Sequence, residues 1–354
     1  MTTSMLPDQA GAAAKAPGVP VEEEEREGPL RRLQHFLHSH PTTIPAFVLL
    51  LGVVFFSVAV GHRFLHPFNL SLIIQQVTII GILGVAQTII ILTAGIDLSV
   101  GAIMVLCSVV MGRLAVDIGL PDYLAILVGI GVGALCGLVN GALISLVRMP
   151  PFIVTLGTWN IFFSLNLWYS QSETIRAQDI EATAPLLQWF GTTIDFLGAR
   201  LTYGSVFMLL LVALFWYLLN WTAWGRHLHA TGDDPDSARL SGIRTSRTLI
   251  SVYVVAGAVC ALAGWALIGR IGSVSPQAGV TSNLDSITAV VIGGTSLFGG
   301  RGSIIGTLIG ALIVGVFRNG LALSGVNVLW QEFAVGLLII VAVAIDQWLR
   351  KLSS

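Results

Sequence analysis

The sequence predicts an all-α, polytopic membrane protein with about ten transmembrane helices. Hydrophobic residues make up 55% of the 354 residues and charged residues only 10%, whereas a soluble domain has about 25% charged residues. The apolar runs are about 18–25 residues long, as helices that cross a hydrocarbon layer of about 30 Å require. The composition therefore predicts a lipid bilayer as the surroundings, and the net charge of −1 predicts no nucleic-acid partner.

The apolar runs place the spans in order along the chain. They cover residues 44–60, 70–92, 98–112, 123–147, 152–169, 203–220, 249–268, 287–298, 304–323 and 328–344. The third and the eighth are short for a full crossing. We expect these two spans to borrow residues from their flanks or to be broken.

The residues before the first span have a different character. Residues 1–40 are rich in Ala, Pro, Gly and Glu and contain an acidic run at 22–25. They predict a disordered cytoplasmic tail, followed by a transmembrane domain over 41–350. An apolar core near the start is absent, so we expect no cleavable signal peptide.

The basic residues predict the orientation. With the amino terminus in the cytoplasm, an even number of spans leaves the carboxyl terminus there too. Lys and Arg are then about twice as frequent in cytoplasmic as in external segments. This arrangement puts the polar segment 221–247 in the cytoplasm and the loop 171–200 outside.

Two halves of the chain share a pattern. Asp97 lies at the start of the third span and Asp285 at the start of the eighth, while Asn140 and Asn319 lie late in the fourth and ninth spans. Each pair is separated by an odd number of spans, so the halves run in opposite directions. The sequence therefore predicts an inverted five-span repeat, in which broken spans at matching positions indicate a transport pathway.

The two aspartates allow two interpretations. A carboxylate inside the membrane is costly, which makes Asp97 and Asp285 candidates for a pathway. Alternatively, each carboxylate caps the free N–H groups of the helix that follows, which is the interpretation we favour. A cap at the start of a pathway helix serves both. Five further residues of the third, fourth, eighth and ninth spans are candidates for the substrate pathway: Ser99, Gly101, Asn140, Thr288 and Asn319.

The fifth span brings polar and aromatic groups together near its start. Thr155, Trp159 and Asn160 supply a hydroxyl, an indole and an amide within about two helical turns. Sugars bind to such mixtures of aromatic faces and neutral hydrogen-bonding groups. The alternative is that these residues hold neighbouring helices together.

The polar segment 221–247 contains signals of a short helix. Asp233 and Asp234 precede Pro235, and Gly242 is suited to end the helix. The simplest structure is an amphipathic helix on the cytoplasmic face, and the alternative is a solvated loop. Such a segment between two spans predicts contact with a partner outside the membrane. The candidate contact residues are Gly232, Asp233, Asp234, Ala238, Arg239, Leu240, Ser241, Gly242 and Ile243.

The spans lack the residue patterns that ATP binding, catalysis or metal binding would require. Lys15 and Lys351, the only lysines, lie near the two termini, so the chain lacks the Gly-rich phosphate-binding loop that ends in Lys-Ser/Thr. Cys107, Cys136 and Cys260 are far apart in the sequence, and no span has a central histidine. We expect no ATP site of its own, no catalytic residues, no metal and no cofactor.

Four motifs resemble one protein family. Residues 95–101, 151–157, 238–243 and 291–303 are similar to permease subunits of bacterial ATP-binding-cassette (ABC) importers of the ribose, xylose and galactose branch. Segment 159–176 is most similar to fructose permeases of that branch. The resemblance implies a homodimer in the inner membrane, with two cytoplasmic ATPase subunits and a periplasmic sugar-binding protein.

The resemblance leads to a functional expectation. We expect a permease that translocates a monosaccharide, fructose or similar, while separate ATPase subunits drive it. The alternative is an ion-coupled secondary sugar transporter, which usually carries acids, His or Lys deep in the membrane. One departure from the family lies at Asp233-Asp234, where Gly-Asn is usual.

Overall fold

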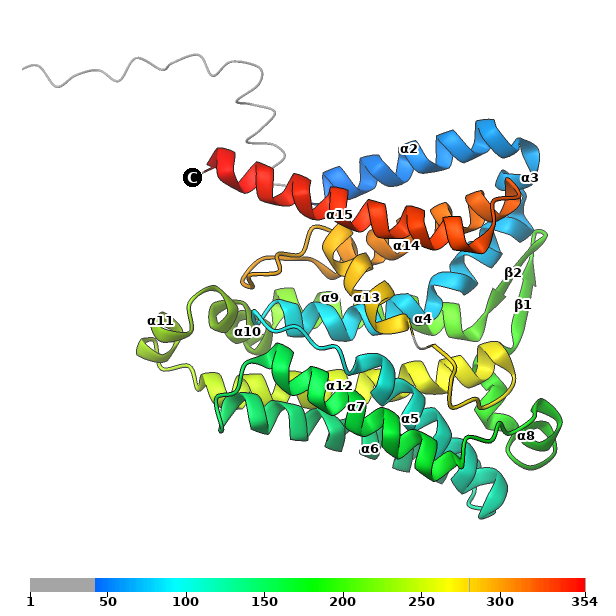
Figure 1. The fold of residues 1–354 in the computed structure, drawn as a ribbon, viewed down its shortest axis with the longest axis horizontal. Coiled ribbons are helices and arrows are strands. Elements are labelled where there is room, and N and C mark those ends of the chain that lie inside the picture. Colours follow the sequence, from blue (N-terminus) through cyan, green and yellow to red (C-terminus); the bar gives the residue numbers. More distant parts are fainter. Residues whose placement is uncertain (1–41, 280, 354) are drawn as a thin grey trace, which may run out of the picture. The chain divides into compact units, whose positions relative to one another are not determined.

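The computed structural model describes residues 42–279 and 281–353. The predicted tail 1–40 lies outside the described residues. The elements in chain order are α2 (Thr43–Val60), α3 (His62–Leu65), α4 (Pro67–Ile91), α5 (Val100–Gly112), the π-helix η1 (Arg113–Asp117), α6 (Asp122–Ser145), α7 (Pro151–Ser170), α8 (Ala177–Thr183), the 3₁₀-helix η2 (Pro185–Gly191), β1 (Thr193–Phe196), β2 (Ala199–Thr202), α9 (Tyr203–Trp221), α10 (Ala223–Asp233), α11 (Pro235–Leu240), α12 (Thr245–Ile271), α13 (Ser282–Ile292), α14 (Ile304–Leu323) and α15 (Val328–Ser353) (Figure 1).

Each predicted span overlaps a helix, and the all-α fold is confirmed. In the described part of the chain, seven helices are long and apolar enough to cross a membrane: α2, α4, α5 with η1, α6, α9, α12 and α14. α13 and the first part of α15, Val328–Leu338, are shorter apolar helices. α7 has the length but is less apolar, because polar side chains such as Asn160 and Asn166 interrupt it. The predicted eighth span was placed too late, since α13 begins at Ser282 and ends at Ile292.

The helix packing agrees with an inverted repeat. The first half consists of α2, α4, α5, α6 and α7, and the second of α9, α12, α13, α14 and α15. α4 packs against α13 and α14, while its counterpart α12 packs against α5 and α6. The second helix of each half is thus enclosed by the third and fourth helices of the other. α4 and α12 also contact each other and are largely buried.

The third helix of each half is either short or extended by flanking residues, as the sequence predicted. α13 has 11 residues, roughly 16 Å, which is less than a bilayer core. The 13 residues of α5 continue directly into η1, and the two together are long enough to cross a membrane. α5 and α13 each follow a segment that is non-helical in its described residues, 92–99 or 272–279 with 281. The two helix starts meet, because the Asn283 amide donates to the Leu98 carbonyl oxygen at 3.2 Å.

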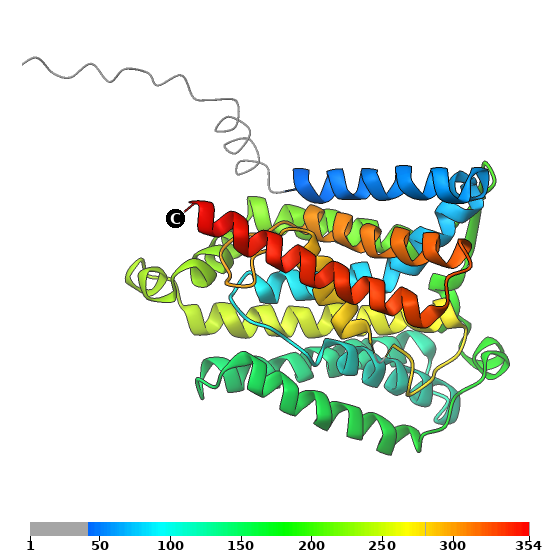
Figure 2. The same cartoon turned by 45° about the horizontal axis from the view of Figure 1, so that its top comes forward.

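Two small structures lie at opposite ends of the helix bundle. α10 and α11 lie at one end, and α8 with the β1–β2 hairpin lies at the other, in both views (Figures 1 and 2). The hairpin strands are antiparallel, with Thr193 opposite Thr202 and Phe196 opposite Ala199. Segments 171–200 and 221–247 are therefore separated by the length of the bundle.

Candidate substrate pathway

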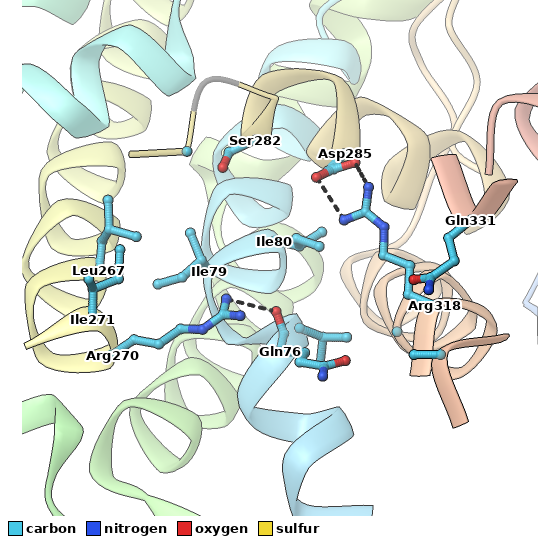
Figure 3. A pocket seen from close by; sticks show the side chains of 14 residues that line it. Gln76, Ile79, Ile80, Leu267, Arg270, Ile271, Ser282, Asp285, Arg318 and Gln331 are labelled. Atoms are coloured by element: carbon cyan, nitrogen blue, oxygen red, sulfur yellow. Dashed lines mark hydrogen bonds and ion pairs between the residues drawn. The ribbon is translucent and has the colours of Figure 1, made fainter. Parts of the chain in front are cut away.

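A cavity of about 440 Å³ lies between α4, α12, α13, α14 and α15 (Figure 3). Its polar lining residues are Gln76, Arg270, Ser282, Asp285, Arg318 and Gln331. Its apolar wall comes mainly from Val77, Ile79, Ile80, Leu267 and Ile271. None of the described lining residues is aromatic. The cavity has the size of a small-molecule site, which typically begins at about 300 Å³.

One side of the cavity holds an ion pair that joins α13 to α14. Arg318 donates to both carboxylate oxygens of Asp285, at 2.9 and 3.1 Å (Figure 3). The same guanidinium contacts Glu332 on α15 at 3.1 Å. Asp285 is 8% exposed, so the bidentate pair is shielded from water on most sides. This geometry fixes the guanidinium plane more firmly than a single contact would.

The other side of the cavity holds a second arginine. Arg270 lies in the last turn of α12, and its guanidinium donates to the backbone carbonyl oxygen of Gln76 on α4 at 3.2 Å (Figure 3). Among the residues that the structure describes, no carboxylate lies within ion-pair distance of it. The cavity therefore places a paired and an unpaired arginine on different helices.

Asp97 lies elsewhere, in a buried cluster at the break before α5. Its Oδ1 accepts from the backbone N–H and the hydroxyl of Ser99, each at 2.6 Å. The Asn140 amide donates to Ser99 Oγ at 2.9 Å and more weakly to Asp97 Oδ2 at 3.4 Å. The Thr155 hydroxyl donates to the Ile96 carbonyl oxygen at 3.1 Å. Four predicted pathway residues thus come together, but away from the cavity.

The hydrogen bonds of Asp97 resemble the helix cap that the sequence predicted, but Asp97 lies two residues before the capping position of α5. The residue directly before α5 is Ser99, and Asp97 holds the turn two residues earlier. Gln87 of α4 donates to the backbone oxygen of Asp97 at 2.7 Å. Asp97 is 2% exposed, and its neighbours supply neutral hydrogen bonds. This arrangement fixes the start of α5.

The remaining predicted pathway residues are dispersed. Gly101 packs against Asn283, and Thr288 hydrogen-bonds the Leu284 carbonyl oxygen of its own helix. Asn319 and Asn69 exchange amide hydrogen bonds at 3.0 Å. Only Asp285 of the predicted set lines the cavity.

The polar and aromatic group on α7 also lies apart from the cavity. Trp159 stacks on Phe163 with an interplanar angle of 2°, and the Asn160 amide donates to Leu156 of its own helix at 3.0 Å. Asn160 borders a shallow hollow on the outer face of α7, beside Trp168. The structure therefore does not bring this group to the cavity.

Sequence reasoning missed five of the polar lining residues: Gln76, Arg270, Ser282, Arg318 and Gln331. A signal was present for two of them. Arg270 and Arg318 are basic residues on the side that the positive-inside rule predicts to be poor in them. In the described part of the chain, no group of three or more His, Cys, Asp or Glu side chains could hold a metal ion.

The polar segment 221–247 forms two helices, α10 and α11, where the sequence predicted one. Asp234 caps α11 by accepting from the N–H groups of Asp236 at 2.9 Å and Ser237 at 3.2 Å. The Ser237 hydroxyl bond, followed by these backbone bonds, lowers the pKa of Asp234. Pro235 opens the helix and Gly242, with φ of 85°, ends it as predicted.

The side chains of α11 differ in what they can offer a partner. Leu240 is 90% exposed, whereas Ala238 is buried. Arg239 is engaged within the segment, where it donates to the Thr245 hydroxyl at 3.0 Å and contacts Asp236 at 3.3 Å. Leu240 is therefore the apolar side chain of α11 that is available for an external contact.

Backbone contacts connect α10 to the break before α5 and to the loop after α13. We call the contact of Leu92, Gly232, Gly299 and Gly300 the glycine junction. The Gly300 N–H donates to the Leu92 carbonyl oxygen at 3.0 Å, and a Cβ on Gly232 would overlap that oxygen. A Cβ on Gly299 would lie 2.6 Å from the Gly232 carbonyl oxygen. Leu92 is the first residue of the break before α5, and Gly299 and Gly300 lie in the loop after α13.

Comparison with known proteins identifies the family. Residues 69–343 match the family described as branched-chain amino acid transport system / permease component. The chain belongs to this permease family. Fructose import permease protein FrcC of Rhizobium meliloti is 59% identical over 92% of this chain and 90% of its own. Ribose import permease protein RbsC of Bacillus subtilis (strain 168) is 41% identical over 86% and 92%. Galactose/methyl galactoside import permease protein MglC of Escherichia coli (strain K12) is 36% identical over 84% and 91%.

No solved structure matches the chain significantly. Family membership confirms that this permease is a multi-pass inner-membrane component of an ABC importer and not itself an enzyme. Permeases of this kind work with ATPase subunits and a periplasmic binding protein. The alternative interpretation, an ion-coupled secondary transporter, is therefore not supported.

Proposed function

We propose that this permease translocates a monosaccharide, fructose or a similar sugar, through the cavity between α4 and α12–α15. The observation that carries the proposal is a cavity of about 440 Å³ lined by amide, hydroxyl, carboxylate and guanidinium groups together with aliphatic side chains. The fructose, ribose and galactose permeases among the relatives support this substrate class. Because no described lining residue is aromatic, we expect the cavity to bind the sugar weakly, which allows the sugar to leave it.

A branched-chain amino acid is the second candidate substrate. The family description names this class, and aliphatic residues such as Ile79, Ile80 and Leu267 form part of the wall. Identity of 59% to a fructose permease along nearly the whole chain favours the sugar. Uptake measurements decide between them.

The proposed assembly contains two copies of the permease. A binding protein delivers the sugar at the end that carries α8 and the β1–β2 hairpin. ATPase subunits dock at α10–α11, where Leu240 enters an apolar groove. Both termini then lie in the cytoplasm. The glycine junction provides the physical route by which movement of α10 reaches the break before α5 and the loop after α13.

Transport by the assembled importer tests the proposal. Vesicles that contain the permease, its ATPase and its binding protein should take up labelled fructose or ribose only with ATP. Ser282→Trp should block this uptake by filling the cavity, whereas Leu165→Trp, on the exposed face of α7, should not. ATP-dependent uptake of leucine in place of sugars would refute the substrate, and uptake driven by a proton gradient alone would refute the mechanism.

The docking surface has its own test. Burying a leucine contributes roughly 1.5–3 kcal/mol, so Leu240→Asp should reduce ATPase association at least about tenfold. Leu197→Asp is the matched control, because Leu197 is an equally exposed leucine (83%) at the other end of the bundle. Equal ATPase binding by wild type and Leu240→Asp contradicts docking through α11.

Labelling tests the orientation. A cysteine at Asp234 should be protected from a membrane-impermeant thiol reagent in intact cells, whereas one at Asp179 should react. Reaction at position 234 from outside would reverse the proposed topology.

A further inference from the structure

We propose that the loop between α13 and α14, residues 293–303, is a second contact surface for the ATPase subunit, beside α11. We call it the α13–α14 loop. The inference rests on the proposed function in taking the end of the bundle that carries α10 and α11 as the end that faces the ATPase. The loop lies at this same end in both views (Figures 1 and 2).

Hydrogen bonds within the α13–α14 loop fix its backbone. The Ser296 N–H donates to the Arg301 carbonyl oxygen at 2.9 Å, which brings the two arms of the loop together. The Ser296 carbonyl oxygen accepts from the Gly299 N–H at 3.1 Å, and the Ser296 hydroxyl oxygen accepts from the Phe298 N–H at 3.2 Å. Gly299 and Gly300 have φ values of 86° and 72°, which residues with a side chain rarely adopt. The side chains of Phe298 and Arg301 are therefore presented by an ordered turn.

The α13–α14 loop is attached to α10 as well as to its own helices. The Gly300 N–H donates to the Leu92 carbonyl oxygen within the glycine junction, and the Gly300 carbonyl oxygen lies 3.1 Å from Nδ1 of His229 on α10. A Cβ on Gly300 would lie only 2.9 Å from a carboxylate oxygen of Asp233, the last residue of α10. α11 begins at Pro235, two residues later. A partner that contacts α11 therefore meets a surface of which the loop is part.

Two side chains of the loop are suited to a protein partner. Phe298 is 68% exposed. Arg301 is exposed as well, and no carboxylate of the described residues forms an ion pair with it. Aromatic and arginine side chains contribute much of the binding energy at protein interfaces. Together with Leu240 of α11 they offer two apolar groups and one cation, which fit an apolar groove on the ATPase with a carboxylate at its rim.

The alternative occupant of this surface is the lipid headgroup layer. Membrane interfaces are enriched in Trp and Tyr, and α9 carries such residues near the end that leads into α10: Trp216, Tyr217 and Trp221, all exposed. In residues 293–303, Phe298 is the only aromatic residue, and glycine, serine and threonine make up most of the rest. This composition, together with the contact to α10, favours the ATPase.

A contact at the α13–α14 loop reaches the cavity by a short path. The loop follows α13 directly, and α13 is a single helix of 11 residues. Asp285, in the first turn of α13, borders the cavity. Rigid secondary elements carry coupling between distant sites. The loop thus gives the ATPase a path to the cavity that does not pass through α10.

Photo-crosslinking in the assembled importer tests the contact without a disruptive mutation. A benzophenone-bearing phenylalanine is placed at position 298, 240 or 196 in a complex of the permease, its ATPase and its binding protein. We expect an adduct with the ATPase from position 298. Phe196 is the matched control, because it is a phenylalanine of similar exposure (64%) on the hairpin at the other end of the bundle. Position 196 should give no ATPase adduct.

Association measurements test the chemistry of the contact. Phe298→Asp and Arg301→Glu should each weaken ATPase binding at least about fivefold, whereas Phe196→Asp and Arg63→Glu should leave it unchanged. Arg63 is an exposed arginine on α3, at the end of the bundle that carries the hairpin (Figure 1). The effect of Arg301→Glu should shrink as salt is raised, because exposed charges are screened. Equal ATPase binding by wild type, Phe298→Asp and Arg301→Glu overturns the proposal.

The crosslinks keep the two proposals distinguishable. An ATPase adduct from position 240 but not from 298 refutes the loop contact and leaves docking through α11 intact. An adduct from 298 but not from 240 supports the loop contact and refutes docking through α11. Adducts from neither position refute both. Adducts from 298 with lipid alone, or with a second copy of the permease alone, also overturn the loop contact.

Discussion

Asp97 and Asp285 occupy related places in the two halves of the repeat, yet their surroundings differ. Asp97 is enclosed by neutral groups, from Ser99 and Asn140, that hold the chain at the break before α5. Asp285 lies in the first turn of α13, pairs with Arg318 and borders the cavity. One half of the repeat thus uses its carboxyl group to fix a helix start, and the other uses it to place a charge beside a cavity.

This difference separates two interpretations that the sequence left open for both residues. A cap and a pathway residue require different neighbours. The cap needs nearby N–H and hydroxyl donors from its own turn, which Asp97 has. The pathway residue needs a partner on another helix and an open volume beside it, which Asp285 has. The inverted repeat is therefore symmetric in its helices and asymmetric in its chemistry.

The largest expected effect is on folding, from Asp97→Leu. The change leaves the Ser99 N–H and the Ser99 hydroxyl without their acceptor in a buried place, at a cost of about 2–4 kcal/mol in the free energy of unfolding. Thermal unfolding in detergent measures this loss. Asp285→Leu is the matched variant, and should cost less than Asp97→Leu because Arg318 keeps Glu332 as a partner. Equal losses in both variants would remove the distinction between the two carboxyl groups.

A smaller effect, on transport, should come from Arg318→Gln. It leaves Asp285 beside the cavity without its cation, and uptake should fall several-fold while the protein stays folded. The double variant Arg318→Gln with Asp285→Asn should recover part of the uptake, because neither charge is then unpaired. Strictly additive losses in the double variant would show that the two side chains act independently.

The smallest expected effect concerns Asp234, a third carboxylate at a helix start, which is fully exposed. Its pKa is lower in the folded chain than the usual value. Its contribution to α11 is therefore complete above about pH 4, the unfolded value, and is lost as the pH falls through the lower folded value. Hydrogen exchange at the Asp236 and Ser237 amides should increase in that acidic range. Asp234→Asn, which caps without titrating, should not show this added pH dependence.

The helices could be predicted because apolar runs and caps are local signals. The break before α13 and the start of α11 at Pro235 follow from such signals. The cavity could not be predicted in the same way. Arg270 and Arg318 lie on helices far apart in the sequence, and no local pattern shows that they share a cavity with Gln76. Asn160 has the residue type of a sugar ligand, but its amide is bonded to its own helix.

The glycine junction has a mechanical consequence. Side chains between two moving elements can change rotamer and absorb part of a displacement. At Gly232, Gly299 and Leu92 the main chains themselves are in contact, so peptide units must move together or separate. The stiffness of this link is then set by covalent geometry and a backbone hydrogen bond. A shift of α10 by a fraction of an ångström should arrive at the break before α5 and at the loop after α13 almost undiminished.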